Sequence, residues 1–440
     1  MQIKTAKFGG SSLADAEGFL RVAAIVRADP ARRYIIPSAP GKRSPGDRKI
    51  TDMLYDCSER AEKKEDFKSL FKSIEERFLS IAERLGTGYD PCPELRLIKE
   101  KLTCGCERDF AASRGEYLCG RLLADLLRFD FIDAADVIFF TEDGRLDGAK
   151  TYASLRASLS LHKRAVIPGF YGSLPDGRIK TFTRGGSDIT GAIVARAAKA
   201  DLYENFTDVC GLLAADPGIV DSPRVIRKIT YRELRELACA GAKVLHGEAI
   251  LPVSAVGIPV NIKNTYKPED PGTFIVADTD GEDERVIGLA GESGYTLIRL
   301  GAENISARHG FCARLFSILE GFGVRIGHLP SGVDGICAVV PTEALDANRE
   351  NVIKEIKESL SPDSVELRDG VALISVVGRG IGESPKTGAE IFSALSEAKI
   401  GVLLIDRGAD DISITVGTDS RDLPEAIRAI YRRIFGRRKP

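Results

Sequence analysis

Between a short extended stretch (residues 178–183) and an apolar, alanine-rich helix (189–199) lie six residues, Thr183-Arg184-Gly185-Gly186-Ser187-Asp188. A strand that ends in two glycines and leads into a helix is typical of an anion site, because the first N–H groups of the helix lack partners and its dipole adds positive potential. The glycines let a ligand approach the backbone, and Arg184 adds a forked donor for a carboxylate or phosphate. A Gly-rich turn before a capped helix gives the same pattern, so this stretch alone leaves both interpretations open.

A second loop of this kind opens the chain. Residues 3–8 predict a buried strand, Gly9-Gly10-Ser11-Ser12 a loop and residues 13–26 a helix. The next predicted strand, 34–37, ends in Ser38-Ala39-Pro40-Gly41. In open parallel sheets such strand ends form the ligand crevice. Two helix N-termini at one crevice could hold both ends of a triphosphate, or a phosphate and a carboxylate, with Lys7 as a point charge between them. An ordinary surface lysine at a strand end remains the alternative for Lys7.

Strands and helices alternate through the rest of this region. Further strands are predicted at 137–141, 165–170, 179–183, 201–205 and 260–264, and further helices at 59–85, 94–102 and 114–129. The charged residues of the helix at 59–85 are predicted to form a solvated face. Glu116 falls in the first turn of the helix at 114–129, where a glutamate is usually just a partner for the helix dipole. The alternation predicts a doubly wound, mainly parallel α/β domain.

Composition excludes several classes of protein. The chain has 440 residues and a net charge of −2, so it carries no excess charge for nucleic acid or a membrane surface. It has no apolar run long enough to span a bilayer and no signal peptide at Met1, which predicts a cytoplasmic protein. The nine cysteines include no CxxC pair and are predicted to be free thiols, and the four histidines form no zinc motif. The P-loop pattern is missing, and residues 378–382 lack the last glycine of a dinucleotide fingerprint.

The C-terminal part of the chain contains a repeat. Apolar positions recur at a constant offset of 76 residues, as from Phe316 to Phe392. Each copy reads strand, loop, helix, strand, turn, strand, with 296–300, 311–321, 324–329 and 335–340 in the first, and this order is the core of a ferredoxin-like βαββαβ unit. The two apolar half-sheets predict side-by-side pairing within or between chains. An acidic stretch at 278–284 marks a boundary, so the predicted domains are residues 1–277, 285–368 and 369–440.

These motifs together resemble the aspartokinases of the amino-acid kinase superfamily. The resemblance covers nearly the whole chain, and the doubled C-terminal unit is similar to the paired ACT regulatory domains of that family. It implies an α/β domain followed by two ACT domains. The resemblance ends after the second ACT-like copy, which predicts a monofunctional chain without the homoserine dehydrogenase half of bifunctional relatives. The matching motifs are Lys7-Phe8-Gly9-Gly10-Ser11-Ser12, Ser38-Ala39-Pro40-Gly41 with Ile50-Thr51-Asp52, Ser113-Arg114-Gly115-Glu116, residues 184–188, Thr207-Asp208-Val209 with Asp216-Pro217, and Gly241-Ala242-Lys243-Val244-Leu245-His246.

The resemblance implies transfer of the ATP γ-phosphoryl group to the β-carboxylate of L-aspartate. A carboxylate with a pKa of about 3.9 is already ionised at neutral pH, so catalysis rests on positioning and charge neutralisation rather than on a general base. The resemblance implies that Lys7 and Asp188 are catalytic and that Mg²⁺ arrives with ATP. Aspartate would be held by Ser38, Thr51, Glu116, Arg184, Gly185, Gly186 and Ser187. The nucleotide would be held by Gly9, Gly10, Ser11, Thr207, Asp208, Leu213, Asp216 and Lys243, although Lys243 also fits a solvated loop lysine.

Three positions depart from the family pattern. Gly218 stands where the family usually has an arginine after Asp-Pro, which puts one phosphate contact in doubt. Leu213 replaces a common aromatic residue, so packing near the nucleotide is expected to be weaker. Gly327 occupies a position where lysine-sensitive relatives carry an aspartate. This last difference puts inhibition by lysine through the usual contacts in doubt.

Regulation is expected to act through the repeat. Exposed strand edges favour a closed two-fold dimer, so we expect a homodimer or a dimer of dimers. The effector is expected to be an aspartate-pathway amino acid, with lysine favoured over threonine, and its polar contacts are predicted at Asn304, Ser306 and Asp334. Two other functions stay open. One is a related kinase for glutamate or an N-acylated amino acid, and the other is a catalytically silent amino-acid sensor that binds nucleotide.

Overall fold

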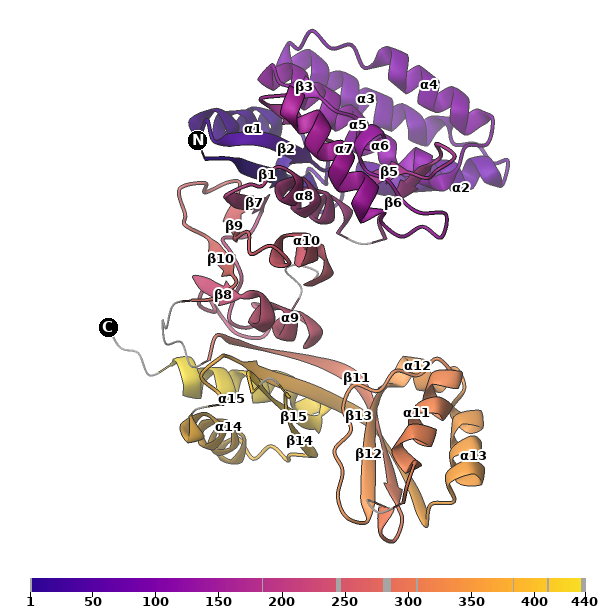
Figure 1. Ribbon diagram of the computed structural model, residues 1–440, viewed down its shortest axis with the longest axis vertical. Coiled ribbons are helices and arrows are strands. Elements are labelled where there is room, and N and C mark those ends of the chain that lie inside the picture. The colour runs from indigo at the N-terminus through magenta and orange to yellow at the C-terminus, as the bar shows by residue number, and fades with distance from the viewer. Residues whose placement is uncertain are drawn as a thin grey trace. The chain divides into compact units, whose positions relative to one another are not determined.

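The structure is a computed structural model, and it describes residues 2–183, 185–242, 247–279, 286–305, 308–382, 384–409 and 411–436. The chain forms two compact units, and neither is a continuous segment (Figure 1). The first unit comprises Met1–Leu212, Arg227–Tyr231 and Val244–Thr279, and the second comprises Leu213–Ile226, Arg232–Lys243 and Asp280–Pro440. No helix in the described ranges is both long and apolar enough to cross a bilayer.

The first unit is built on an eight-stranded sheet. All neighbouring strands with described register are parallel except the pair β9–β10, which is antiparallel. This confirms the predicted doubly wound, mainly parallel α/β fold. The strand order is β3 (Asp130–Phe131), β4 (Ala165–Val166), β2 (Arg32–Pro37), β1 (Lys4–Phe8), β7 (Leu202–Thr207), β9 (Val260–Asn264), β10 (Thr273–Val276) and β8 (Lys228–Thr230).

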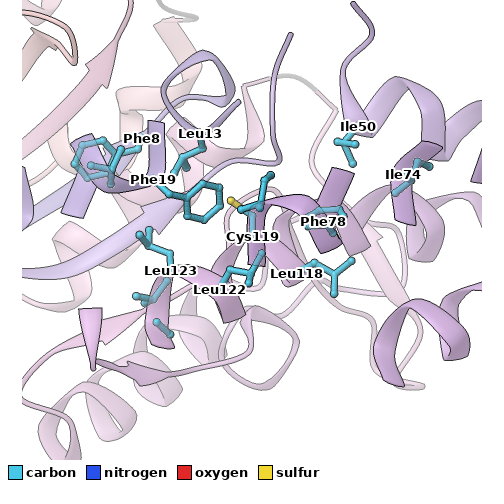
Figure 2. Packing of buried hydrophobic residues seen from close by; sticks show 14 of the residues in the cluster. Phe8, Leu13, Phe19, Ile50, Ile74, Phe78, Leu118, Cys119, Leu122 and Leu123 are labelled. Carbon is cyan, nitrogen blue, oxygen red and sulfur yellow. The ribbon is translucent and has the colours of Figure 1, made fainter. Parts of the chain in front are cut away.

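Helices cover both faces of this sheet. One apolar cluster joins Ala6, Phe8 and Phe206 of the sheet to five helices, and Figure 2 shows Phe8 and Phe19 among its members. These helices are α1 (Ala16–Ala28), α2 (Ile50–Glu62), α3 (Lys68–Leu85), α4 (Cys92–Thr103) and α5 (Arg108–Leu127). A second cluster joins Ile36 and Ile167 to helices on the other face, namely α6 (Ala134–Val137), α7 (Gly148–Leu161) and α8 (Gly186–Ala197). Residues that alternate along β2 therefore face different helix layers, Ile35 in the first cluster and Ile36 in the second.

Several predicted elements of this unit were wrong in their bounds. The helix expected at 59–85 is two helices, because the chain turns at Lys64, whose φ is 58°. Helix α5 begins at Arg108 rather than 114, so Glu116 lies well inside the helix and not in its first turn. The strand expected at 137–141 does not form, since α6 ends at Val137 and only isolated bridges follow.

The hairpin before α8 also differs from the prediction. Strand β6 (Ile179–Thr181) pairs antiparallel with β5 (Tyr171–Ser173) in a separate two-stranded sheet, so it does not extend the main sheet. The unit is completed by two 3₁₀ helices, at Gly10–Leu13 and Gly247–Ile250, and by α10 (Leu251–Ser254).

The second unit is built on one antiparallel five-stranded sheet, in the order β12 (Gly335–Pro341), β11 (Gly288–Gly301), β13 (Ser364–Val377), β15 (Ser413–Asp419), β14 (Leu404–Arg407). β11 and β13 are long enough to run through both halves of the sheet, so the two repeat copies pair side by side within one chain. The predicted boundary at residue 368 falls inside β13. The strand expected at 324–329 does not form, although Gly327 and His328 do bond to Val339.

Each half of this sheet has its own core. The first half packs against α11 (Phe311–Gly321), α12 (Thr342–Asp346) and α13 (Arg349–Leu360), and the second against α14 (Pro385–Glu397) and α15 (Leu423–Phe435). Two segments that precede the sheet in the chain belong to the same unit. Ala215 and Val220 are buried in the core of the second half. Glu233 of α9 (Tyr231–Cys239) is fully buried and pairs with Arg379 at 3.2 Å.

Candidate active site

Two buried side chains, Lys7 and Asn205, meet the partly buried Asp188 at the carboxyl ends of the central strands. Lys7 of β1 and Asn205 of β7 are register partners on neighbouring parallel strands, so their side chains point to the same face of the sheet. Asp188 reaches them from the first turn of α8. Lys7 Nζ lies 2.6 Å from Asp188 Oδ1 and donates a hydrogen bond to Asn205 Oδ1 at 3.3 Å. Asn205 Nδ2 in turn donates to Asp188 Oδ1 at 2.9 Å.

This cluster is largely shielded from water. Lys7 is 8% exposed and Asn205 is 3% exposed. Taking charges out of water is costly unless they are paired and hydrogen-bonded, and Asp188 fulfils both needs for Lys7. The ammonium also lies beside the first loop, since a Cβ built on Gly9 would be 3.6 Å from Lys7 Nζ. The structure therefore places the predicted catalytic pair together, next to the predicted phosphate loop.

The loops after β1 and β2 are joined backbone to backbone. Gly41 N donates to Gly10 O at 2.8 Å, and Ser38 N donates to Phe8 O at 3.0 Å. A Cβ at Gly10 would lie only 2.7 Å from Ala39 O, so only glycine allows this approach. Gly10 and Ser11 are in a 3₁₀ helix rather than an irregular loop. The two predicted turn motifs thus form one structure.

Arg77 of α3 holds these loops together by hydrogen bonds, and its role was not predicted from the sequence. Its guanidinium donates to Ala14 O at 3.0 Å and also to Gly41 O, and it lies 3.3 Å from Asp47. Arg77 is 5% exposed, which corrects the prediction that the charged residues of this segment form a solvated face. Burial lowers its pKa, against the pull of Asp47. The spacing of Arg77 in its helix could not indicate this role, because the carbonyl groups that it binds lie in loops distant in sequence.

Glu116 of α5 is the buried carboxyl group of the predicted aspartate site. It is 5% exposed, and its Oε2 has no hydrogen-bond partner. Burial raises its pKa to about 8, although a backbone N–H of Ala39 and the charge of Arg114 act in the other direction. Gly115 sets this position, since a Cβ there would lie 2.8 Å from Ala39 Cβ. A buried carboxyl group with one oxygen that lacks a hydrogen-bond partner is suited to bind a cationic ligand group.

Two further predicted residues, Ser38 and Thr51, each lie next in the chain to a residue that packs against Gly115, the neighbour of Glu116. Ser38 follows β2 directly, and Thr51 lies in the first turn of α2, where N–H groups lack intrahelical partners. Both are partly exposed. Ala39 touches α5 through Gly115, so the loop that carries Ser38 is packed against the helix that carries Glu116.

The N-terminus of α8 is as tightly packed as its glycines suggest. Gly185 is the N-cap in a left-handed conformation, with φ 58°. Gly186 allows contact with Phe170, and Ser187 is buried against Gly169. Arg184, predicted to grip a carboxylate, lies outside the described residues. Phe170 was missed by sequence reasoning, yet it has φ 82°, an uncommon conformation for a bulky residue that is often found at functional sites.

The predicted nucleotide residues are distributed over both units. In the first unit, Thr207 Oγ1 donates to Asp208 Oδ1 at 3.2 Å. In the second unit, Asp216 Oδ1 accepts a hydrogen bond from Gly218 N at 2.7 Å, and Leu213 is partly exposed. Lys243 lies outside the described residues. The roles of these residues toward a nucleotide therefore stay predictions.

Two of the predicted regulatory residues, Asn304 and Asp334, are joined by a hydrogen bond in the second unit. Asn304 has φ 52°, and its N–H donates to Asp334 Oδ1 at 2.8 Å. Both side chains are exposed. Ser306 lies outside the described residues. The bond joins two segments of the chain but uses one oxygen of the carboxylate that was predicted to bind an effector.

The described residues contain no cluster of three or more His, Cys, Asp or Glu side chains that could hold a metal ion. Asp188 uses the same oxygen, Oδ1, for Lys7 and for Asn205. A single carboxylate oxygen fits Mg²⁺ only where substrate phosphates supply further ligands, which is how Mg²⁺ is often held. The donor set is therefore compatible with a metal that arrives on a nucleotide.

Comparisons with known proteins match both units. Residues 3–264 match the amino acid kinase family, and residues 374–434 match an ACT domain. The chain is 35% identical to Aspartokinase 3 of Bacillus subtilis, with 98% of this chain and 99% of that protein covered. A crystal structure of the aspartate kinase of Clostridium acetobutylicum has a TM-score of 0.89 at 44% identity, covering 99% of this chain and 100% of that one.

Two structures of E. coli aspartokinase III are also similar. One, in complex with aspartate and ADP and described as the R-state, has a TM-score of 0.77 at 26% identity. The other, in complex with lysine and aspartate and described as the T-state, has a TM-score of 0.74 at 25% identity. Each comparison covers 99% of this chain and 100% of the other.

Proposed function

The chain belongs to the aspartokinases of the amino acid kinase family, and from this premise we propose that it transfers the γ-phosphoryl group of ATP to the β-carboxylate of L-aspartate, giving 4-phospho-L-aspartate. The observation that carries the proposal is the ion pair between the buried Lys7 and the partly buried Asp188, 2.6 Å long, at the strand ends beside the Gly9–Gly10 turn. The acceptor carboxylate is already ionised, so the protein must align it and neutralise the charge on the transferred group. A preorganised ammonium beside a loop of backbone N–H groups is suited to this task.

We assign the two ends of the site by charge. Glu116 would take the α-ammonium of aspartate, since it is a buried carboxyl group without a partner for Oε2. Arg184 would grip a carboxylate in a bidentate fork, with Ser38, Thr51 and Ser187 as neutral donors. Gly9, Gly10 and Ser11 would cradle phosphate oxygens. Thr207, Asp208, Leu213, Asp216 and Lys243 would line the nucleotide.

Mg²⁺ would enter with ATP. Both hydrogen-bonded contacts of the Asp188 carboxylate fall on Oδ1, so Oδ2 is the oxygen proposed to face the metal or a water bound to it. When bound, the cation would offset negative charge on the phosphates. Lys7 would then act on the transferring group itself, and Asp188 would hold Lys7 in place.

A hydroxamate assay tests the activity directly. Purified protein is incubated with ATP, Mg²⁺ and one of L-aspartate, L-glutamate or N-acetylglutamate, and the acyl phosphate is trapped with hydroxylamine. Turnover with aspartate alone supports the proposal. Preference for another acid would favour the related kinase, and nucleotide binding without turnover would favour a silent sensor.

We propose lysine as the effector and the two hydrogen-bonded segments that carry Asn304 and Asp334 as part of its site. The E. coli structure in complex with lysine supports a lysine effector in this family. Dimers would be needed if the effector lies between paired units, because these two exposed segments alone offer few contacts. Initial rates with millimolar lysine, threonine or methionine, together with the mass in solution at each condition, test this assignment. Indifference to all three amino acids would contradict it.

Gly218→Arg should lower the KM for ATP by about two- to fivefold, the range that an exposed ion pair of up to ~1 kcal/mol can give. Gly218 is exposed, and a Cβ there would lie 3.2 Å from Asp216 Oδ1, so a side chain fits after a small shift. Gly218→Gln is the uncharged control and should leave the KM unchanged. An unchanged KM in the arginine variant would show that another cation already fills this place.

A chain that ends at Thr279 should lose affinity for ATP together with stability, rather than becoming an unregulated kinase. Ala215 and Val220 would lose the core in which they are buried, and Glu233 would lose Arg379. The loss of this ion pair and the exposure of apolar side chains both destabilise these segments. Thermal unfolding and nucleotide titration of this fragment, with a chain that ends at Gly436 as control, give the measurement. A fragment with the affinity and melting temperature of the full chain would contradict the prediction.

A further inference from the structure

Asn205 contacts both members of the catalytic pair, although it is neither charged nor part of a motif noted above. Its Oδ1 accepts from Lys7 Nζ at 3.3 Å, and its Nδ2 donates to Asp188 Oδ1 at 2.9 Å. An ammonium can only donate and a carboxylate can only accept, so this orientation of the carboxamide is the one that satisfies both partners. Leucine has a similar shape but could make neither bond.

We infer that Asn205 is a positioning residue, which fixes the direction of the Lys7 ammonium for phosphoryl transfer. The inference rests on the proposed role of Lys7. A lysine side chain has four rotatable bonds, and a single contact to Asp188 would let the ammonium swing about that contact. The orientation of the Lys7 ammonium is fixed by two partners on different elements, Asp188 on α8 and Asn205 on β7.

The contacts of the Lys7 ammonium leave one of its N–H groups available to the phosphate loop. An ammonium has three N–H groups, and Asp188 and Asn205 take two of them. The third N–H group can point toward the loop at Gly9, because Gly9 lies beside Lys7 Nζ. Because Asn205 is neutral, it holds Lys7 without cancelling its charge, whereas a second carboxylate would weaken the field on the phosphoryl group.

Asn205→Leu tests this inference, with Asn261→Leu as a matched control. Asn261 lies on β9, the next strand of the same sheet, and is also 3% exposed, but its Oδ1 has no partner and it pairs in register with Glu204. In Asn205→Leu we expect kcat to fall about 10- to 100-fold, as for a catalytic group displaced by roughly 1 Å, with both KM values within about threefold of wild type. Asn261→Leu should keep kcat within about twofold.

Asn205→Asp separates positioning from packing. It keeps the shape and the acceptor for Lys7, but places a second carboxylate 2.9 Å from Asp188 Oδ1, where one of the two must hold a proton to keep the bond. The titratable groups around it are Lys7 of β1, Asp188 of α8 and Tyr203, whose hydroxyl bonds to Asp188 O. The activity of this variant relative to wild type should therefore rise as the pH falls from 8 to 6, by about tenfold.

The outcomes are distinct. Asn205→Leu with kcat within threefold of wild type overturns the inference, and so does a loss matched by Asn261→Leu. If Asn205→Leu does not fold, Asn205→Asp decides, because a ratio that is constant with pH overturns the inference. Lys7→Ala is measured in parallel. If that variant stays active, the proposed role of Lys7 is wrong independently of Asn205.

Discussion

Replacing Lys7 with alanine should lower kcat about 100- to 1,000-fold, with the KM for ATP changed far less. An electrostatic contact that strengthens in the transition state is worth roughly 3–4 kcal/mol. Lys7 meets the structural conditions for such a contact, since it is 8% exposed, paired at 2.6 Å and adjacent to the phosphate loop. Its charge matters most when negative charge spreads over the transferred group, so the loss should appear in kcat. Steady-state kinetics with both substrates varied give the measurement.

Lys4→Ala is the matched control for this variant. Lys4 lies on the same strand and also forms a lysine–aspartate pair, with Asp29 at 2.7 Å, but its side chain is more exposed and lies at the other end of β1. Losing that pair should cost at most about 1 kcal/mol of stability and leave kcat unchanged. If Lys7→Ala keeps more than about a tenth of wild-type kcat, a loss below roughly 1.4 kcal/mol, Lys7 is not the catalytic cation.

Local patterns predicted the parts of the fold that are set by neighbours in sequence. The strand before Gly9 and the helix after Gly186 were found because glycine pairs, buried strands and apolar helices have local signals. The break at Lys64 was missed, since the apolar spacing continues across it and a single left-handed residue carries no strong sequence signal. The predicted start of α5 was wrong for the same reason, since the helix begins at Arg108 and not at residue 114.

Site residues that belong to a sequence motif could be predicted, whereas residues whose place in the site depends on tertiary contacts were missed. Lys7 and Asp188 meet as expected. Asn205 and Arg77 could not be found, because an asparagine in a strand and an arginine in a helix acquire their roles only from β1 and from the loop carbonyls that they reach. The buried state of Glu116 was also missed, since it results from the true start of α5 and from the packing of Gly115.

That burial leads to the second large effect. Glu116→Gln should raise the KM for aspartate roughly 100-fold, since loss of a charge-assisted contact in a buried site costs about 2–3 kcal/mol or more, while the KM for ATP should change little. Glutamine keeps the size of the side chain and removes its charge. Glu107→Gln is the control at the N-cap of the same helix, because Glu107 is exposed and paired with Arg178 at 2.9 Å. Equal changes in both KM values would show that Glu116 supports the fold or the nucleotide instead.

The pH dependence of this effect has a defined sign. Burial raises the pKa of Glu116 to about 8, so the group is largely protonated in the free enzyme at pH 7. An ammonium ligand requires the ionised form, and aspartate binding should therefore release a proton. The KM for aspartate should rise roughly tenfold or more as the pH falls from 8.5 to 6.5, and this dependence should be missing in Glu116→Gln.

Stability gives an independent measurement of the same proton. The pKa of Glu116 in the folded state lies above that of an exposed glutamate, so the group's contribution to stability is fully present below about pH 4.5 and is lost as the pH rises through 8. Free wild-type enzyme should therefore lose more stability than Glu116→Gln between pH 6.5 and 9, and saturating aspartate should reverse that loss by pairing the carboxylate. Melting temperatures of both proteins, with and without aspartate, test this. Parallel pH profiles for the two proteins would show that Glu116 is already ionised in the free enzyme, and the expected proton release would then be wrong.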